Sequence, residues 1–360
     1  MFFRYRIMRL LNCSTIILMD FLDIDGSHME GGGQILRIAT GLSAVTGKPV
    51  RVSNIRNNRP QPGLKPQHLK GIEAVARMCN ARISGFTEGS TEIEFTSGEL
   101  CHDHFRIDIG TAGSIGLVFQ SLMIPAVLTD KPLEFEVTGG TDVSWSPSVT
   151  YFREVFCHFI KRMGIETEAE IKSYGFYPKG GGRVLLRVHP GSLRPINLTD
   201  RTRFVRYDIL SIASEALRKA RVAERQAESA VSVLGRKSEC ELREYVNSES
   251  QGSSIHAHAH FENTLLGATL LGERGKPAEE VGRECALMLQ KQVESGACFD
   301  RWMGDQILPF MAMAPGKSSI SVPEVSGHAR TSMWLIEQFL PVGFETEESG
   351  GHFIISSRHA

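Results

Sequence analysis

The alternation of apolar and polar positions predicts a mixed α/β chain that begins with the order β-α-β-α-β-β. Ile35 to Val45 carries apolar residues at helical spacing and stops at Gly47, and Pro49 to Ile55 alternates as a strand. A second predicted helix runs from Gln67 to Met78. The other predicted strands of this first copy are Asp23 to Asp25, Ala81 to Phe86 and Thr91 to Thr96.

The same order of elements recurs later in the chain. The second copy has predicted strands at Phe105–Ile109, Leu133–Thr138, Ile165–Ile171 and Arg183–Val188, with helices after Gly110–Ser114 to about Val127 and at Pro147–Met163. A third, partial copy has helices at Phe299–Ala314 and Ala329–Leu340 and strands at Ser318–Val322, Val342–Glu347 and His352–Ser356. Self-similar order at this scale is typical of a repeated supersecondary unit. We therefore predict three βαβαββ repeats that form one large domain.

The stretch between the second and third copies has a different pattern. It reads as strand, charged helix, three strands and helix, the order of elements found in thioredoxin-like folds. We predict a large domain at residues 20–195 and 297–360 and a smaller inserted α/β domain at 196–296. Residues 1–19 are predicted to be an extension that is possibly not translated, because Arg9 interrupts its apolar run and no cleavage site follows.

Composition limits the classes of partner and the compartment. The 360 residues are 41% hydrophobic and 22% charged, with a net charge of −1, so any nucleic acid would be held by a local patch. The seven cysteines are scattered and form no CxxC pair. They indicate reduced thiols and a cytoplasmic protein. The N-terminal apolar run is too short and too interrupted to span a bilayer, so no membrane role is expected.

Candidate chemistry begins at Ser326–Ser332, where a predicted strand is followed by a predicted helix. This order places His328 at or just before the helix N-terminus. Free N–H groups and the helix dipole there attract anions and disfavour the imidazolium form. A neutral imidazole beside a phosphate is able to attack phosphorus. A capping or packing histidine at a strand–helix corner is the alternative.

The glycine-rich stretch Glu30–Gln34 also opens a predicted helix. Its three glycines allow close approach to a ligand, Glu30 offers an oxygen ligand for Mg²⁺ or Mn²⁺, and Arg37 lies one turn further on. A flexible connection explains the glycines equally well. The loop with Arg56 and Arg59 could track phosphate or simply be solvated.

Three further groups have weaker patterns. Trp302, Asp305 and Gln306 can share one helix face and hold a base, or form a mixed surface. His256, His258 and His260 share one strand face, and Cys101–His104 resembles a ligand run. Neither of the last two groups has the paired spacing of a structural zinc site, so we discount both. The Pro178–Gly182 run is predicted to be a hairpin turn.

Taken together, these motifs resemble RNA 3′-terminal phosphate cyclase from about Asp25 onward. The stretches that carry the resemblance are Asp25–Gly26, Glu30–Arg37, Arg59, Pro62–Leu64, Gln67–Leu69, Gly110–Ser114, Gly139–Asp142, Gly175–Pro178, Gly180–Gly182, Asp305–Gln306 and Leu308–Pro309. The family's architecture, three βαβαββ repeats with an inserted smaller α/β domain, agrees with the predicted order of elements.

The resemblance implies an ATP-dependent reaction on RNA. A histidine takes AMP from ATP and passes it to an RNA 3′-phosphate, and the adjacent 2′-hydroxyl then displaces AMP to give a 2′,3′-cyclic phosphate. The matching nucleophile is His328, and Glu30 matches the metal ligand for Mg²⁺ or Mn²⁺. The positions matching the nucleotide and phosphate site are Arg37, Arg59, Gln67 and Gln120, with Trp302, Asp305 and Gln306 toward the adenosine.

Two departures from the family pattern and two rival functions remain. Trp302 replaces a frequent tyrosine, and Thr331–Ser332 stands where Thr-Asn is usual, yet either ring can stack and serine can still form hydrogen bonds. One rival is the family's non-catalytic branch, a ribosome-assembly factor that lacks the nucleophile. The other is enolpyruvyl transfer on a related fold, which needs no histidine nucleophile.

Overall fold

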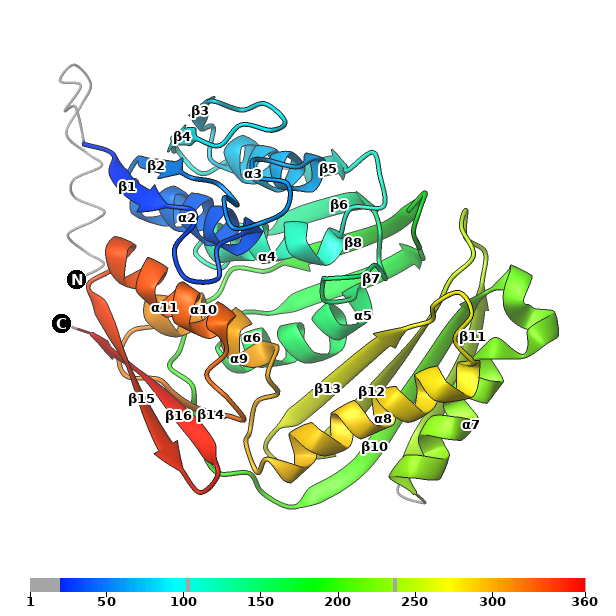
Figure 1. The fold of residues 1–360 in the computed structure, drawn as a ribbon. Coiled ribbons are helices and arrows are strands. Elements are labelled where there is room, and N and C mark those ends of the chain that lie inside the picture. The colour runs from blue at the N-terminus through cyan, green and yellow to red at the C-terminus, as the bar shows by residue number, and fades with distance from the viewer. Residues whose placement is uncertain (1–19, 102–103, 236–237, 360) are drawn as a thin grey trace.

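The computed structural model describes residues 20–101, 104–235 and 238–359, and the predicted N-terminal extension lies outside this range. The described residues form a mixed α/β structure with four four-stranded sheets (Figure 1). The first copy consists of β1 (Leu22–Asp25), α2 (Gly33–Thr46), β2 (Val50–Ser53), α3 (Pro66–Met78), β3 (Arg82–Ser84) and β4 (Ile93–Thr96). These elements confirm the order predicted for the first stretch.

The second copy repeats that order with a longer second helix. It consists of β5 (His104–Asp108), α4 (Ile115–Ala126), β6 (Leu133–Gly139), the continuous helical segments α5 (Val149–Tyr151), Phe152–Phe156 and α6 (Cys157–Arg162), β7 (Thr167–Ser173) and β8 (Gly182–Val188). The middle helical segment is a π-helical turn, so the single predicted helix contains a local widening. The Pro178–Gly182 run forms the predicted turn between β7 and β8, with a bridge from Phe176 to Gly180.

The third copy is complete once a two-residue strand is included. It consists of β9 (Asn197–Leu198), α9 (Met303–Gln306), α10 (Leu308–Met313), β14 (Ser319–Val322), α11 (Gly327–Phe339), β15 (Val342–Ser349) and β16 (His352–His359). The three sheets have the orders β1-β2-β4-β3, β5-β6-β8-β7 and β9-β14-β16-β15, each with its first two strands parallel. The predicted boundary at residue 196 assigned β9 to the smaller domain, whereas its pairing with β14 joins it to the third sheet.

Helices of the three copies meet in one shared apolar core. Helix α2 packs against α3, α4 and α11, and α10 packs against α11 (Figure 1). Strands such as β6 alternate buried and partly exposed residues, because one face covers helices and the other faces solvent. The side chains that converge from all three copies include Ile35, Phe119 and Leu335, each fully buried.

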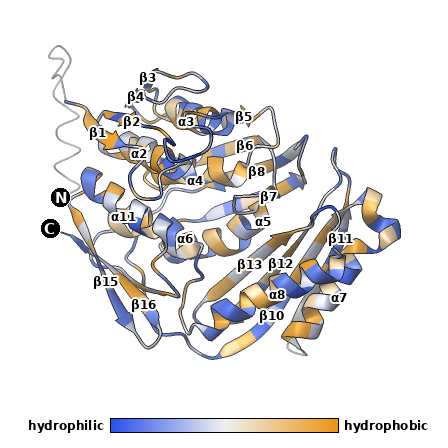
Figure 2. Ribbon diagram, in the orientation of Figure 1, coloured by the Kyte–Doolittle hydropathy of each residue, from blue (hydrophilic) through white to orange (hydrophobic). Residues whose placement is uncertain are grey.

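Between β9 and α9 the chain forms a fourth sheet with its own core. It consists of β10 (Phe204–Ser214), α7 (Val222–Leu234), β11 (Ser238–Val246), β12 (Ser253–Phe261), β13 (Leu265–Leu271) and α8 (Ala278–Glu294), with strand order β11-β10-β12-β13. Blue and orange alternate along α7 and α8, as expected of amphipathic helices (Figure 2). A separate cluster that includes Ile255 and Leu289 forms the core.

Two predicted helices are broken in the structure. The charged helix predicted at 217–234 is a 3₁₀ turn, Glu215–Ala220, followed by α7, because Arg221 adopts a left-handed φ of 51°. The helix predicted at 299–314 divides into α9 and α10 at Ile307, next to Pro309. In the described part of the chain, no helix is long and apolar enough to cross a membrane.

Candidate active site

Helix α11 places His328 at its N-terminal turn. Chain direction changes after β14 at Pro323, and Ser326 then caps the helix, its Oγ accepting the N–H of Ala329 at 3.0 Å. His328 is the second helical residue, and 49% of its side chain is exposed. The prediction of a histidine at a helix N-terminus is therefore correct, and its ring is open to solvent.

The glycine-rich loop before α2 lies directly opposite His328. Glu30 Oε1 lies 3.4 Å from His328 Nε2 and 3.8 Å from Arg59 Nη2. The approach of the two segments is so close that a Cβ at Gly327 would lie 2.5 Å from Glu30 Oε2. A side chain larger than glycine here would displace the Glu30 carboxylate from its position beside the histidine.

The surroundings of His328 favour its neutral form. Burial lowers the pKa of this imidazole below its ordinary value, and the positive charges of Arg37, Arg59 and Arg301 lower it further, while Glu30 acts in the opposite direction. The ring is therefore unprotonated at neutral pH, as a nucleophile requires.

Gln34 connects the glycine-rich loop to α11. Its Nε2 donates to the His328 carbonyl at 2.9 Å and also to the hydroxyl of Ser332, which is fully buried one turn further along the helix. The resemblance left the role of Ser332 open. In the structure this serine accepts a hydrogen bond from the loop that carries Glu30, so it helps to hold that loop on the helix of His328.

Arg37 and Gln67 lie together beside a buried histidine that the candidate set omitted. Both line a small cavity with His68, and a Cβ at Gly33 would lie 2.5 Å from His68 Nε2. Burial lowers the pKa of His68 to about 3, with Arg37 adding to the effect, so this ring is neutral. Its Nδ1 accepts the N–H of Lys65 at 3.1 Å, which fixes the start of α3.

Arg37 interacts with Asp305, an acid of the third copy that is mostly protonated at neutral pH. Burial lowers the pKa of Arg37 to about 10, against the attraction of Asp305. Burial also raises the pKa of Asp305 to about 8, against the attraction of Arg37. Arg37 is thus a cation with reduced hydration, a state in which its attraction to phosphate is strengthened.

The residues expected toward the adenosine, Trp302, Asp305 and Gln306, lie at the start of α9 and within it, next to Gln120 of α4. Gln120 Nε2 donates to Gln306 Oε1 at 2.8 Å, and Gln306 Nε2 donates to the Trp302 carbonyl at 2.9 Å. The Trp302 ring lies edge-on to Tyr151 with centroids 6.4 Å apart. Buried Asp300 supports this turn by accepting the N–H groups of Trp302 and Met303.

All the predicted site residues fall into this region, but in two groups. One group lies around the N-terminal end of α11 and consists of Glu30, Arg37, Arg59, Gln67 and His328. The other is a neighbouring hydrogen-bonded set of Gln120, Trp302 and Gln306. Asp305 interacts electrostatically with Arg37 of the first group. Sequence reasoning missed Gln34 and His68 as site members, although both stand inside the motifs that carried the resemblance.

The residues present fit a metal ion that is carried by a nucleotide. In the described ranges, no three His, Cys, Asp or Glu side chains gather as a ligand set. Glu30 alone offers a partly exposed carboxylate beside His328. Mg²⁺ commonly uses one or two protein carboxylates with substrate phosphates and water, so a single glutamate is compatible with this mode.

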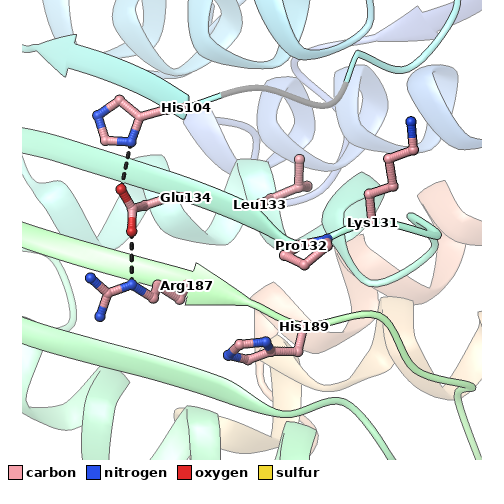
Figure 3. Close-up of a pocket in the computed structure, with 7 residues that line it drawn as sticks. All are labelled: His104, Lys131, Pro132, Leu133, Glu134, Arg187 and His189. Carbon is pink, nitrogen blue, oxygen red and sulfur yellow. Dashed lines mark hydrogen bonds and ion pairs between the residues drawn. The ribbon is translucent and has the colours of Figure 1, made fainter.

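Two other features lie apart from this site. A pocket of about 360 Å³ on the second sheet is lined by His104, Lys131, Pro132, Leu133, Glu134, Arg187 and His189, none of them a predicted site residue. Figure 3 shows Glu134 between His104 and Arg187, in contact with both, so these charges form ion pairs across the strands. Cys101–His104 includes residues 102–103, which lie outside the described ranges.

The fold and the site define a repeated α/β protein with a neutral histidine set among cations and beside a carboxylate. The family model described as RNA 3′-terminal phosphate cyclase matches residues 28–346. A protein of Methanopyrus kandleri named RNA 3′-terminal phosphate cyclase is 44% identical to this chain, over 92% of this chain and 97% of the relative. A protein of Pyrococcus furiosus with the same name is 46% identical, over 91% of this chain and 96% of the relative. The chain belongs to the RNA 3′-terminal phosphate cyclase family, and its likeness to relatives that carry the cyclase name makes it an enzyme of that family rather than a member of the non-catalytic branch.

Proposed function

We propose that this chain uses ATP to convert an RNA 3′-terminal phosphate into a 2′,3′-cyclic phosphodiester through a histidine–AMP intermediate. The observation that supports it best is the half-exposed, neutral His328 at the start of α11, faced by Glu30 and by arginines. This arrangement combines an unprotonated nucleophile with positive charge for phosphate, which nucleotidyl transfer requires.

The first proposed step loads the enzyme. An unprotonated ring nitrogen of His328 attacks the α-phosphorus of ATP, a nitrogen–phosphorus bond forms, and the bond to pyrophosphate breaks. Arg37 and Arg59 stabilise the negative charge that develops on the leaving group. Trp302, Asp305 and Gln306 hold the adenosine, while Gln67 and Gln120 contribute to the nucleotide and phosphate site. A divalent metal held by Glu30 would supply further charge neutralisation at the triphosphate.

The later proposed steps act on the RNA end. An oxygen of the RNA 3′-phosphate attacks the AMP phosphorus and displaces His328, so that the 3′-end becomes adenylated. The neighbouring 2′-hydroxyl then attacks the 3′-phosphorus and loses its proton, and AMP leaves. One ATP is consumed for each cyclic end, with AMP and pyrophosphate as products.

An experiment with ATP labelled at the α-phosphate tests this proposal. Wild-type protein with Mg²⁺ or Mn²⁺ is expected to retain an acid-labile label after denaturation, and a 3′-phosphorylated RNA is expected to discharge it and gain a cyclic end. His328→Ala should retain no label, whereas His260→Ala, with its own partner Asp208 in another part of the molecule, should label normally. Absence of label on folded, metal-loaded wild type would contradict the proposal.

We also propose that the protein is cytoplasmic, because its described cysteines are free thiols. Cys79, Cys101, Cys157, Cys285 and Cys298 are free, which suits the reducing cytoplasm.

A further inference from the structure

Two aromatic side chains project from the surface without packing partners to cover them. Trp145 is 100% exposed and Tyr177 is 76% exposed, whereas the other large aromatic rings in the described ranges are at least partly buried. Trp145 also has a φ of 65°, a left-handed value that is unusual for a bulky residue. A ring that stays exposed buries little apolar surface in the folded protein, so it adds little to stability and remains accessible to a ligand.

The two rings belong to loops that are joined to each other. Trp145 follows β6, and Tyr177 lies in the turn between β7 and β8. A parallel bridge pairs Asp142 with Phe176, and the N–H of Thr141 donates to the Gly175 carbonyl at 2.9 Å. Trp145 lies three residues after the bridge and Tyr177 one residue after it. The Cα atoms of the two aromatic residues are therefore within about 20 Å of one another.

These loops adjoin the candidate active site through the loop before α4. The Gly140 N–H donates to the Gly113 carbonyl at 2.8 Å, and a Cβ at Gly180 would lie 2.9 Å from the Cα of Ala112. On its other side, a Cβ at Gly113 would lie 3.5 Å from the Cβ of Gln67. Continuous backbone contact therefore leads from the phosphate-site residue Gln67 to the two exposed rings.

The exposed chain neighbours of the rings are mostly polar, with Pro178 the apolar one. Ser144 and Ser146 flank Trp145, and the exposed Lys179 lies two residues after Tyr177. A protein-binding patch would add apolar neighbours to form a continuous surface. Isolated aromatic rings with a nearby cation are instead typical of surfaces on which the bases of a single strand stack.

We propose that Trp145 and Tyr177 form a stacking platform for the single-stranded RNA that precedes the terminal phosphate. This proposal rests on the proposed function, because it assigns the RNA strand of the same reaction. With the 3′-end beside His328 and Gln67, the nucleotides upstream of it cross the loop before α4 and stack on the two rings. The platform holds any sequence, since every base offers a stacking face.

The platform can be tested by changing the length of the RNA. Substrates are a 3′-phosphorylated RNA of about ten nucleotides and a 3′-phosphorylated dinucleotide, which is too short to reach both rings. Trp145→Ala and Tyr177→Ala are each expected to raise KM for the longer RNA about tenfold and the double variant further. KM for the dinucleotide, kcat and AMP labelling should stay within about twofold of wild type, because a surface substitution usually changes free energies by no more than a few tenths of a kcal/mol.

Matched variants separate stacking from general damage. Trp145→Phe and Tyr177→Phe retain a ring and should retain most of the affinity for the longer RNA. Leu287→Ala removes an exposed apolar side chain from α8 and should change neither KM. Thermal unfolding of each variant confirms that the comparison is made between folded proteins.

The outcomes distinguish this proposal from the proposed function. A wild-type protein that takes up no AMP and makes no cyclic ends contradicts the cyclase proposal itself. An active wild type whose alanine variants keep the same KM for both RNAs contradicts the platform alone, and the rings would then serve a protein contact. An equal rise in KM for both RNAs also overturns the platform, because stacking upstream nucleotides cannot affect a dinucleotide that does not reach them.

Discussion

His328 and the histidines of β12 have contrasting surroundings in this molecule. His328 stands at a helix end with about half of its side chain exposed and cations nearby. His256 and His258 lie on one face of β12 and are buried, and the pKa of His258 falls to about 3, chiefly because of burial. Both groups were chemical candidates in the sequence, but only His328 is open to a substrate.

Hydrogen-bond partners explain what each group does. His256 lies 3.3 Å from the Asp142 carboxylate and contacts the hydroxyls of Ser148, Ser254 and Thr269. These contacts join the fourth sheet to the second copy, where Asp300 also links Tyr151 to the Gly267 N–H. The contacts of buried His256 indicate a structural role, whereas the accessible His328 has the surroundings that the proposed reaction requires.

After the loss of His328 itself, the largest effect on activity is expected from removing the cation of Arg37. Arg37→Met keeps the length of the side chain, loses the charge, and should reduce AMP labelling roughly 100- to 1000-fold, because leaving-group stabilisation is lost. Arg37 also lowers the pKa of His328, so the acid limb of the residual labelling should move to higher pH. Initial rates of labelling measured across pH 5 to 8, the range in which an imidazole titrates, check both effects.

A matched control for that variant is available on the first sheet. Arg82→Met removes an exposed arginine from β3 and should leave the labelling rate and its pH profile unchanged. Equal labelling by Arg37→Met and wild type would show that His328 does not depend on its cationic surroundings, and would remove the physical basis of the contrast between the two groups of histidines.

The next largest effect should be on stability, from replacing His256. His256→Asn removes the partner of Asp142 Oδ1, while Thr141 still donates to Oδ2, and should lower the free energy of unfolding by about 3 kcal/mol. Labelling per folded molecule should remain near wild type, because His256 contacts no residue of the His328 site. Urea unfolding and AMP labelling of the same samples measure the two effects. His260→Asn, which alters a partly exposed histidine of the same strand, should lower the free energy of unfolding by less.

The variant His256→Asn also tests how the inserted domain is held against the rest of the molecule. We propose that β10 to α8, within the predicted range 196–296, form the inserted domain, with hinges near Gly191 and Gly296, and that the His256 contacts hold it in place. Limited proteolysis should then cut near these glycines faster in His256→Asn than in wild type. Unchanged cleavage in a destabilised variant would count against docking by this network.

Local periodicity was sufficient to predict most elements of the fold. Apolar spacing predicted α2, α3 and α11 to within a few residues, because each buries one face. The two residues of β9 carry no periodic signal, and only their pairing with β14 reveals them. For the same reason Gln34 was not assigned its role, since its partners His328 and Ser332 are about 300 residues away in the chain.

Titration of Asp305 should produce an effect on stability that depends on pH. Its pKa of about 8 means that the folded protein keeps a proton which the unfolded chain releases near pH 4. Stability from this group therefore falls as pH rises from about 4 to 8, by at most about 1.4 kcal/mol per unit. Asp305→Asn should remove that loss, so its stability relative to wild type should increase over this range in urea unfolding. A constant difference would contradict the raised pKa.

The smallest effect is expected at Ser332, which distinguishes positioning from chemistry at the His328 helix. Ser332→Ala removes one of the two acceptors of Gln34 and should slow AMP labelling roughly 3- to 10-fold, the value of one ordinary hydrogen bond. Because His328 keeps its cationic surroundings, the pH profile should not shift. Ser357→Ala removes another fully buried serine hydroxyl, from β16, and controls for the loss of a buried hydrogen bond. A shift of the profile in Ser332→Ala would mean that the Gln34 contact affects the ionisation of His328 as well as its position.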